Sequence, residues 1–438
     1  MSEISKFPYF EVEFTKDGTI HDQSELEQAA DGLSKSKVTD LFVFSHGWNN
    51  DMDQARELYR DFFASMRAVM DKKEQQMAGR KFGVLAVLWP SKKFADEDLI
   101  PSGAASTGDV IDEQKVTERI DHLKDALDTK TAEKKLEQAK DLVADLENDP
   151  AVQDAFVDKI RSLLPKPKKD EEVANEFFTL SGQEIFKRLE APPGFDSVPE
   201  VGGGAAAMES WSDGGAASFG DFFGGIRAAA WRLLNYTTYY VMKERAGTVG
   251  RDGVSKAIPQ IIARLPNLKV HLIGHSFGGR VVTAAADALG NKESTKPASM
   301  SLLQAAFSHN GFANKFDGTR DGFFRAVVTG KKVKGPIIIT YTRNDRAVGF
   351  AYPIASKLSG IDAAAIGDEN DRFGGLGRNG ALVKLTPEAT AGELLALPGA
   401  YSFTSGKLFN LEASTFISDH GGVTGKEVAN AVFCAATA

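Results

Sequence analysis

One serine of the chain lies in a pattern that can make a hydroxyl group nucleophilic. Residues 274–278 read Gly-His-Ser-Phe-Gly, a G-x-S-x-G motif centred on Ser276, between an apolar stretch and an Ala- and Val-rich stretch. At a sharp turn from strand to helix, the serine is held in a strained backbone conformation and its oxygen lies at the positive end of the helix dipole. The motif therefore predicts that Ser276 attacks acyl carbonyl groups.

A serine hydroxyl is nearly inert at neutral pH, so this chemistry needs a base within hydrogen-bond reach. Of the seven histidines, His420 fits best, because it lies in a glycine-flanked loop between the last predicted strand and the final predicted helix. His309, which follows a predicted strand, is the serious competitor. We expect His420 to be the general base. The other histidines lie in tight backbone motifs, in a strand or in polar stretches: His21, His46, His122, His271 and His275.

A histidine base works only when a carboxylate holds it in the correct tautomer. Asp345 lies just past the apolar run 337–341 and is the predicted partner. Asp419 is adjacent to the histidine, and adjacent side chains usually diverge, so we reject it. Asp317 and Asp321 are weaker alternatives because they fall in a polar segment before that run. The resulting order along the chain, serine then aspartate then histidine, is the order found in α/β hydrolases.

The negative charge that develops on the attacked carbonyl oxygen needs backbone N–H donors. The residue after the nucleophile, Phe277, supplies one of them. A second is expected from the loop after an early strand, where residues 45–49 read Ser-His-Gly-Trp-Asn. Gly47 allows a tight turn there, and the N–H of Trp48 is the predicted donor.

Composition limits the class of protein. The 438 residues carry a net charge of −8 and are 42% hydrophobic, which fits a globular protein and argues against nucleic-acid binding. The single cysteine, Cys434, cannot form an internal disulfide. The sequence lacks a metal-ligand pairing at helical spacing, a phosphate-binding glycine loop and a dinucleotide fingerprint, so we expect no cofactor and no metal.

Targeting signals are also missing from the sequence. Residues 1–9 lack the basic and apolar regions of a secretory signal, and no apolar run reaches the ~20 residues that span a bilayer. We therefore expect a cytoplasmic location and no transmembrane segment, although export by a signal-independent route leaves no such trace. Nothing in the sequence indicates the oligomeric state.

The elements that must position these residues alternate between strand and helix. Apolar runs predict buried strands at 41–44, 84–88, 270–273, 301–307, 337–341 and 408–411. Helical periodicity predicts helices at 24–34, 254–265, 277–289 and 425–435. An alternating stretch at 9–14, ended by a turn at Asp17 and Gly18, predicts an edge hairpin. This rhythm predicts a mostly parallel central sheet flanked by helices.

The alternation of predicted strands and helices stops between residues 92 and 235. Apolar residues at three- and four-residue intervals predict two antiparallel helices with a break near Thr129, and a third helix from Val152 to Leu164. A glycine-rich loop near 191–217 precedes an aromatic stretch at 219–242, which suits either packing or a mobile lid over an apolar pocket. We therefore expect residues 1–91 and 236–438 to form the core and residues 92–235 to form a helical cap.

Three segments of the chain resemble a group of bacterial α/β hydrolases. They are Ser-His-Gly-Trp-Asn-Asn at 45–50, Trp-Pro-Ser at 89–91 and Gly-His-Ser-Phe-Gly-Gly-Arg at 274–280. The resemblance extends over residues 38–91 and 235–435 and implies the α/β-hydrolase fold, with the catalytic and oxyanion roles at the positions already named. It does not cover the long insertion or any substrate preference that the insertion sets.

The expected reaction is hydrolysis of a small-molecule or lipid carboxylic ester through an acyl-enzyme, because it needs nothing beyond these parts. A lipase or phospholipase, including one delivered as a toxin, would use the aromatic stretch as a lid and make peripheral contact with lipid. A serine peptidase or amidase would use the same triad but needs a site for a charged substrate terminus. The alternative outside enzymes is a protein that binds a partner through its charged helical arm and retains a relic triad.

Overall fold

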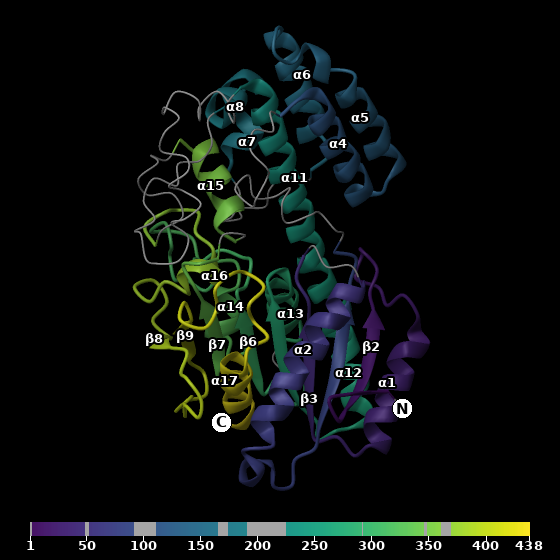
Figure 1. The fold of residues 1–438 in the computed structure, drawn as a ribbon, viewed down its shortest axis with the longest axis vertical. Coiled ribbons are helices and arrows are strands. Elements are labelled where there is room, and N and C mark those ends of the chain that lie inside the picture. Colours follow the sequence, from purple (N-terminus) through teal and green to yellow (C-terminus); the bar gives the residue numbers. More distant parts are fainter. Residues whose placement is uncertain are drawn as a thin grey trace, which may run out of the picture. The chain divides into compact units, whose positions relative to one another are not determined.

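The computed structural model describes residues 2–48, 52–91, 111–164, 174–190, 225–290, 292–345, 348–360 and 369–438 (Figure 1). The chain forms two compact units. One comprises Met1–Lys93, Met242–Gly349 and Gly374–Ala438, and the other comprises Phe94–Val241 and Phe350–Phe373. The predicted core of 236–438 includes residues 236–241 and the described residues 350–360 and 369–373, which belong to the second unit.

Within the described residues of the first unit, nine strands form one sheet in the order β1-β2-β4-β3-β5-β6-β7-β9-β8. Their bounds are β1 Glu3–Ile4, β2 Phe7–Glu13, β3 Asp40–Ser45, β4 Phe82–Leu88, β5 Lys269–His275, β6 Ser299–Leu303, β7 Ile337–Tyr341, β8 Ala389–Glu393 and β9 Leu408–Glu412. Each neighbouring pair is parallel except β1 and β2. The prediction of an α/β fold with a mostly parallel sheet is confirmed.

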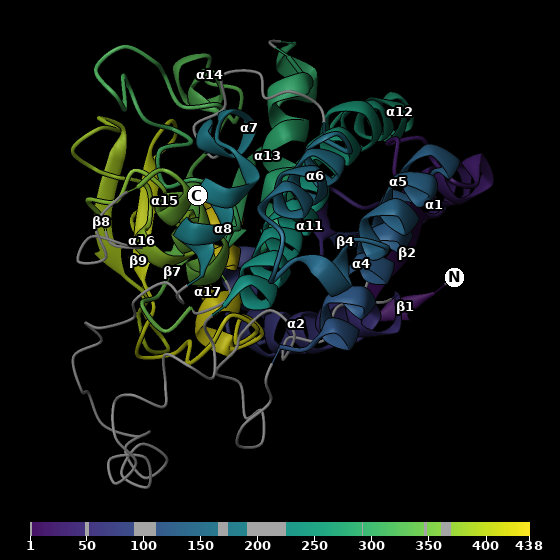
Figure 2. The ribbon, with the colours of Figure 1, turned by 90° about the horizontal axis from the view of Figure 1, so that it is seen from above.

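Helices cover both faces of this sheet, as Figure 2 shows. α2 (Met52–Met70) and α17 (Lys426–Thr437) pack on one face, and α1 (Gln23–Lys35), α12 (Ser255–Arg264) and α13 (Phe277–Ala288) pack on the other. The pleat of β3 requires both layers, because its side chains alternate between the faces and all of its residues are buried. Phe44, for example, contacts Phe62 of α2 with ring centroids 5.0 Å apart.

Two predicted elements differ from the structure. The strand predicted at 301–307 ends at Leu303, where Gln304 follows with φ +46° and turns the chain out of the sheet. The hairpin predicted after residue 14 is reduced to a single antiparallel bridge between Phe14 and Ile20. β2 instead pairs with β1 on one side and, in parallel, with β4 on the other.

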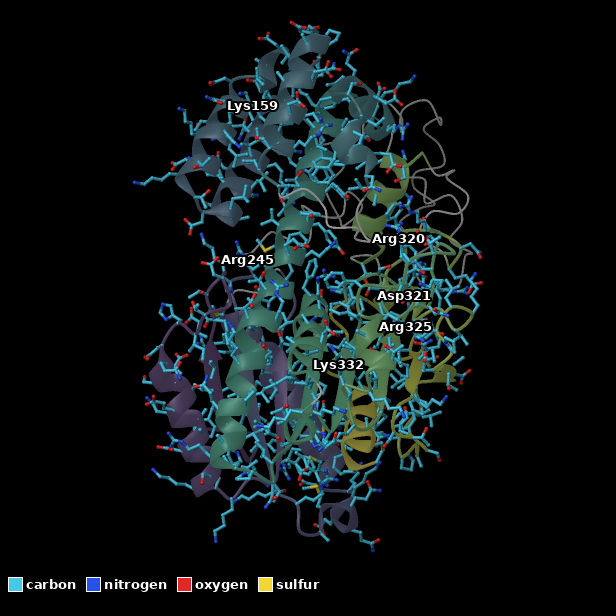
Figure 3. All side chains as sticks on the ribbon, turned by 180° about the vertical axis from the view of Figure 1, so that it is seen from behind. Lys159, Arg245, Arg320, Asp321, Arg325 and Lys332 are labelled. Carbon is cyan, nitrogen blue, oxygen red and sulfur yellow. The ribbon has the colours of Figure 1, made fainter. Side chains whose placement is uncertain are left out.

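Ion pairs and hydrogen bonds hold the segment between β6 and β7. Arg325, the first residue of α14 (Arg325–Thr329), donates to both carboxylate oxygens of Glu388 at 2.6 and 2.9 Å. Lys332 donates to the carbonyl oxygen of Asp287 at 2.7 Å. Both basic residues are labelled in Figure 3. These contacts connect the segment to the end of α13 and to the residue before β8, and so restrain the chain that leads into β7.

The direction of the chain across the sheet reverses between β3 and β5. From β3 the chain continues to its neighbour β4 on one side, whereas from β5 it continues through β6 and β7 on the other side. In open parallel sheets, ligands bind outside the carboxyl ends of the strands at such a switch point. The loop 46–48 follows β3 and Ser276 follows β5, so both predicted catalytic segments lie at this position.

The second unit consists mainly of the inserted helices. Those described are α4 (Glu113–Leu127), α5 (Lys130–Lys140), α6 (Pro150–Arg161), α7 (Glu176–Thr179), α8 (Gly182–Leu189) and parts of α11 (Ile226–Thr248) and α15 (Val348–Leu358). The helix break lies at Thr129 as predicted, since Thr129 Oγ1 accepts a hydrogen bond from Ala132 N at 3.2 Å and caps α5. The glycine-rich loop at 191–217 and residues 219–224 of the aromatic stretch lie outside the described residues. No helix in the described ranges is both long and apolar enough to cross a membrane.

Candidate active site

Ser276 lies at the turn between β5 and α13. Its backbone has φ +55° and ψ −125°, a conformation that non-glycine residues rarely adopt. Its amide donates to the carbonyl oxygen of Leu303 at 3.0 Å, and its own carbonyl oxygen accepts from Ala306 N at 3.0 Å. Both partners flank the end of β6, so the neighbouring strand holds the strained turn in place.

The glycines on both sides of Ser276 are sterically required. A Cβ atom at Gly274 would lie 2.3 Å from the carbonyl oxygen of Gly278. A Cβ atom at Gly278 would lie 2.0 Å from the carbonyl oxygen of Ser45. No side chain fits at these distances, so β5, α13 and the end of β3 approach one another as closely as the motif predicts.

His420 and Asp345 are joined by a hydrogen bond, with His420 Nδ1 2.8 Å from Asp345 Oδ2. The side chain of His420 is 23% exposed and that of Asp345 is 0% exposed, so the ring reaches solvent while the carboxylate is buried. Asp345 follows β7 and His420 follows β9, and because these strands are parallel neighbours their loops leave the sheet at the same edge. A carboxylate only accepts hydrogen bonds, so Nδ1 is the donor and Nε2 has the lone pair that can accept a proton.

His420 also lies beside the residue that precedes the predicted nucleophile. The rings of His275 and His420 have centroids 4.9 Å apart, and His275 Nε2 lies 2.9 Å from the carbonyl oxygen of His420. Among the described residues, Ser276 Oγ makes no hydrogen bond, with His420 or with any other group. The structure therefore brings aspartate and histidine together and places the histidine next to the neighbour of Ser276. Catalytic hydrogen bonds between a nucleophile and its base often form only when substrate is bound.

The loop after β3 lies directly against Ser276. A Cβ atom at Gly47 would lie 2.6 Å from Ser276 Cβ and 3.1 Å from Ser276 Oγ, so the Gly47 backbone borders the hydroxyl group. The next side chain, Trp48, contacts Phe277 with ring centroids 5.8 Å apart. Both residues predicted to donate to an oxyanion are thus neighbours at this edge of the sheet.

His46 fixes the shape of this loop. Trp89 N donates to His46 Nε2 at 3.3 Å, so the proton of the neutral ring is on Nδ1, which lies 2.8 Å from the carbonyl oxygen of Gly47. The two rings stack with centroids 5.5 Å apart, and Trp89 Nε1 donates to His46 O at 3.0 Å. Tyr59 accepts from His46 N at 2.9 Å. The Trp-Pro-Ser segment and the Ser-His-Gly-Trp segment therefore form one rigid bonded unit.

Gln304 belongs to the site but is not among the predicted site residues. Gln304 Nε2 donates to Asp345 Oδ2 at 3.3 Å and to the carbonyl oxygen of Gly377 at 2.9 Å. Its side chain is completely buried. The sequence gives one indication of this role, because Gln304 is a polar residue inside the apolar run 301–307. A strand buried along its whole length would not contain it.

The competing residues are engaged elsewhere. His309 is buried, and its Nδ1 lies 3.1 Å from Asn379 Nδ2. Asp317 accepts bonds from Thr319 and Arg320 within its own turn, Asp321 accepts one from Lys315 N, and Asp419 accepts one from Gly421 N. Each of these groups therefore has a local structural role.

Buried neutral histidines at the site predict a loss of stability in acid. Burial lowers the pKa of His46 to about 4 and the pKa of His275 to about 3, from an ordinary value of 6.5. Above pH 6.5 both rings are neutral in the folded and the unfolded chain, so their contribution is complete and constant. Below that pH only the unfolded chain takes up protons, and the free energy of unfolding falls by up to ~1.4 kcal/mol per pH unit for each histidine.

Urea unfolding between pH ~7 and ~5.5, a range above the midpoints at which ordinary carboxylates titrate, measures this effect. His275→Gln removes one of the titrating groups and should make the decline shallower. An unfolding midpoint that stays constant over this range would contradict the prediction.

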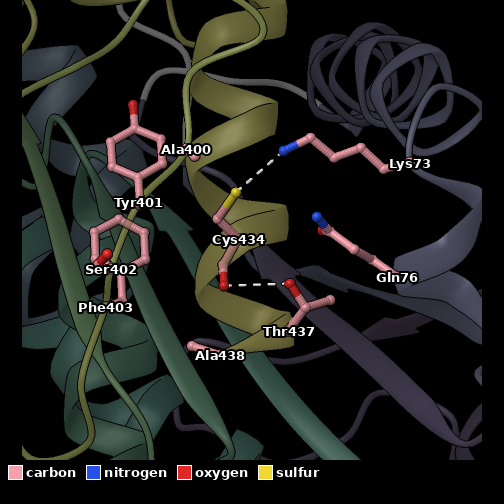
Figure 4. Close-up of a pocket in the computed structure, with 9 residues that line it drawn as sticks. All are labelled: Lys73, Gln76, Ala400, Tyr401, Ser402, Phe403, Cys434, Thr437 and Ala438. Atoms are coloured by element: carbon pink, nitrogen blue, oxygen red, sulfur yellow. Dashed lines mark hydrogen bonds between the residues drawn. The ribbon is translucent and has the colours of Figure 1, made fainter.

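Other features of the chain lie away from this edge of the sheet. A cavity of about 340 Å³ is lined by residues that include Lys73, Tyr401 and Cys434 (Figure 4). It lies toward the amino ends of the strands, since Arg80 donates both to Ala436 O near the cavity and to Asp40 at the start of β3. In the described part of the chain, no three His, Cys, Asp or Glu side chains are placed to hold a metal ion. No family model, curated protein or solved structure with which the chain was compared matches it.

Proposed function

We propose that this chain is a serine hydrolase of the α/β-hydrolase fold that cleaves carboxylic esters through an acyl-enzyme. The observation that carries the proposal is the positive-φ Ser276 between β5 and α13, at the same sheet edge as the bonded pair of His420 and Asp345. The position of Ser276 beside the switch point and the serine-aspartate-histidine order along the chain support it further.

In the proposed mechanism, Ser276 Oγ attacks the acyl carbon while His420 Nε2 takes the hydroxyl proton. Asp345 accepts from His420 Nδ1 and stabilises the imidazolium that forms. The N–H groups of Phe277 and Trp48 bind the oxyanion of the tetrahedral intermediate. His420 then protonates the departing alkoxide, and the acyl group remains on Ser276. A water molecule, deprotonated by His420, hydrolyses this acyl-enzyme and restores the serine hydroxyl.

An ester substrate is favoured because its carbonyl carbon is more electrophilic than that of an amide, because an alkoxide leaves more easily than an amide anion, and because the five groups above suffice for the reaction. A lipase would require the aromatic stretch at 219–242 to form an exposed lid. Its tyrosines Tyr236, Tyr239 and Tyr240 are buried, which favours packing. A small-molecule or lipid ester is therefore the proposed substrate, and an amide or peptide is the competing outcome of the test.

Fluorescent fluorophosphonate labelling tests the proposal, together with hydrolysis of nitrophenyl esters of increasing acyl length and of matched anilides. We expect labelling of the native protein and complete loss of labelling and esterase activity in Ser276→Ala, because the attacking oxygen is gone. Ser301→Ala is the matched control, since Ser301 is equally buried in the neighbouring strand β6. It should be labelled like the native protein.

Each other outcome has a defined meaning. Equal hydrolysis of esters and anilides would show that the protein is an amidase and not an esterase. Activity that rises on lipid aggregates would favour a lipase. A native protein that neither reacts with the probe nor hydrolyses any substrate would overturn the proposal in favour of a partner-binding protein.

A further inference from the structure

His275 occupies the variable position before the nucleophile, and its single hydrogen-bond donor points to the base. It is the last residue of β5 and is buried. Burial, followed by repulsion from His420, lowers the pKa of His275 to about 3, so the ring is neutral and carries one N–H. The carbonyl oxygen of His420, 2.9 Å from His275 Nε2, can only accept. The proton is therefore on Nε2, and Nδ1 has no hydrogen-bond partner among the described residues.

This bond restrains the part of His420 that Asp345 does not. Asp345 fixes the ring of His420 through Nδ1. The backbone of His420 belongs to the long loop between β9 and α17, whose earlier part is tied to the β7 turn by Asn344 Nδ2, 3.0 Å from the carbonyl oxygen of Ile417. His275 adds a second attachment at His420 itself. The ring and the backbone of the base are thus each held by a separate group.

The attachment links the base to the nucleophile over a very short path. His275 and Ser276 are consecutive, and Ser276 is itself fixed by its bonds to Leu303 and Ala306. Catalytic groups must be held within about 0.5 Å of the productive geometry, and a displacement of about 1 Å can cost about 10²-fold in rate. The bond from His275 ties the loop of the base directly to the strand that leads into the nucleophile.

We propose that His275 is a positioning residue, whose Nε2–H holds the backbone of His420 at a fixed distance from Ser276. The role rests on the proposed serine hydrolase function and explains why an imidazole at this position is more than a space-filling group. It acts through His420 and does not touch the reacting atoms.

Substitutions that remove or restore the N–H donor test this role. His275→Phe removes the N–H and keeps an aromatic ring, whereas His275→Gln places an amide N–H close to the position of Nε2. We expect His275→Phe to lower kcat for nitrophenyl acetate and the rate of fluorophosphonate labelling at least about tenfold, with KM unchanged. His275→Gln should recover most of this loss. If the Phe variant does not fold, His275→Asn, whose shorter amide cannot reach the carbonyl oxygen, replaces it with the same expectation.

His271→Phe is the matched control, because His271 is also buried in β5 but bonds to Asp40 and Ser299. It should lower the unfolding temperature and leave kcat unchanged at temperatures where it is folded. A folded His275→Phe with native kcat would overturn the inference, as would a Gln variant no better than Phe or an equal loss in His271→Phe. Native protein that is not labelled, or labelling that survives Ser276→Ala, would instead refute the serine hydrolase itself.

Discussion

Replacing Asp345 with asparagine is expected to lower kcat for ester hydrolysis by about 10⁴-fold while the protein remains folded. The change removes one charge and almost no volume. Asp345 is completely buried, and its Oδ2 lies 2.8 Å from His420 Nδ1. The effect should come from the tautomer of His420, because the proton must be on Nδ1 for Nε2 to accept the proton of Ser276.

The surroundings of Asp345 determine which way an asparagine would point. Val348 N donates to Oδ1 at 2.9 Å, and Gln304 Nε2 donates to Oδ2 at 3.3 Å. An amide nitrogen at the Oδ1 position would face a backbone N–H, which cannot become an acceptor. At the Oδ2 position it would face His420, whose ring can move its proton to Nε2 and accept at Nδ1. An amide nitrogen there would also face Gln304 Nε2, which keeps its bond to the carbonyl oxygen of Gly377 at 2.9 Å. The second arrangement therefore costs less, and it leaves a histidine that cannot act as the base.

Asp419→Asn is the control for this substitution. Asp419 directly precedes His420, so Asp419→Asn makes the same chemical change beside the same histidine. The carboxylate of Asp419 accepts a hydrogen bond from Gly421 N at 2.8 Å and makes none with the ring of His420. Its kcat should stay within about twofold of the native value. Measured with nitrophenyl esters and checked by thermal unfolding, an Asp345→Asn variant that keeps more than about a tenth of native kcat would show that Asp345 does not orient the base.

Local sequence patterns were sufficient to place Ser276, Asp345 and His420 at one edge of the sheet. The turn around Ser276 is encoded in five consecutive residues, because only glycine fits at the first and the last of them, Gly274 and Gly278. Asp345 and His420 could be placed because each follows a recognisable strand, and parallel strands send their following loops to the same edge. The hydrogen bond between them confirms their proximity.

Contacts over long sequence separations could not be predicted in this way. Gln304 and His275 act on groups that lie 41 and 145 residues further along the chain, and no local pattern reports such partners. The segment that contains Leu358 gives another example. Leu358 O accepts from Arg188 Nη1 at 2.5 Å across 170 residues.

A second set of serine, histidine and aspartate shows why residue types alone do not define a site. His271 lies 3.1 Å from Asp40 Oδ1 and 2.9 Å from Ser299 Oγ. Asp40 and Ser299 are the first residues of β3 and β6, so the network joins three neighbouring strands within the sheet. Ser299 does not lie at a turn from the end of a strand into a helix, as Ser276 does. Position at the carboxyl end of a strand is what distinguishes Ser276.

Substituting Gly47 with alanine is expected to lower kcat by about 10³-fold, the loss that follows removal of an oxyanion donor. The new methyl carbon would lie 2.6 Å from Ser276 Cβ, closer than real Cβ atoms approach other atoms, and a tight 3.1 Å from the hydroxyl oxygen of Ser276. Ser276 is held in place, because its N–H donates to Leu303 O and its carbonyl oxygen accepts from Ala306 N. The loop after β3 must therefore move, and the N–H of Trp48 moves with it.

The effect should be confined to the reaction, because the backbone of Gly47 does not require a positive φ and alanine can adopt its conformation. Gly392→Ala, on the edge strand β8, is the matched control, since its nearest neighbours would lie at 3.6 and 3.7 Å. It should retain native kcat and native stability. Comparison of kcat, labelling rate and thermal unfolding for the two variants tests whether the loss is confined to the reaction. A folded Gly47→Ala enzyme with native kcat would remove the loop after β3 from the site and require a different donor for the oxyanion.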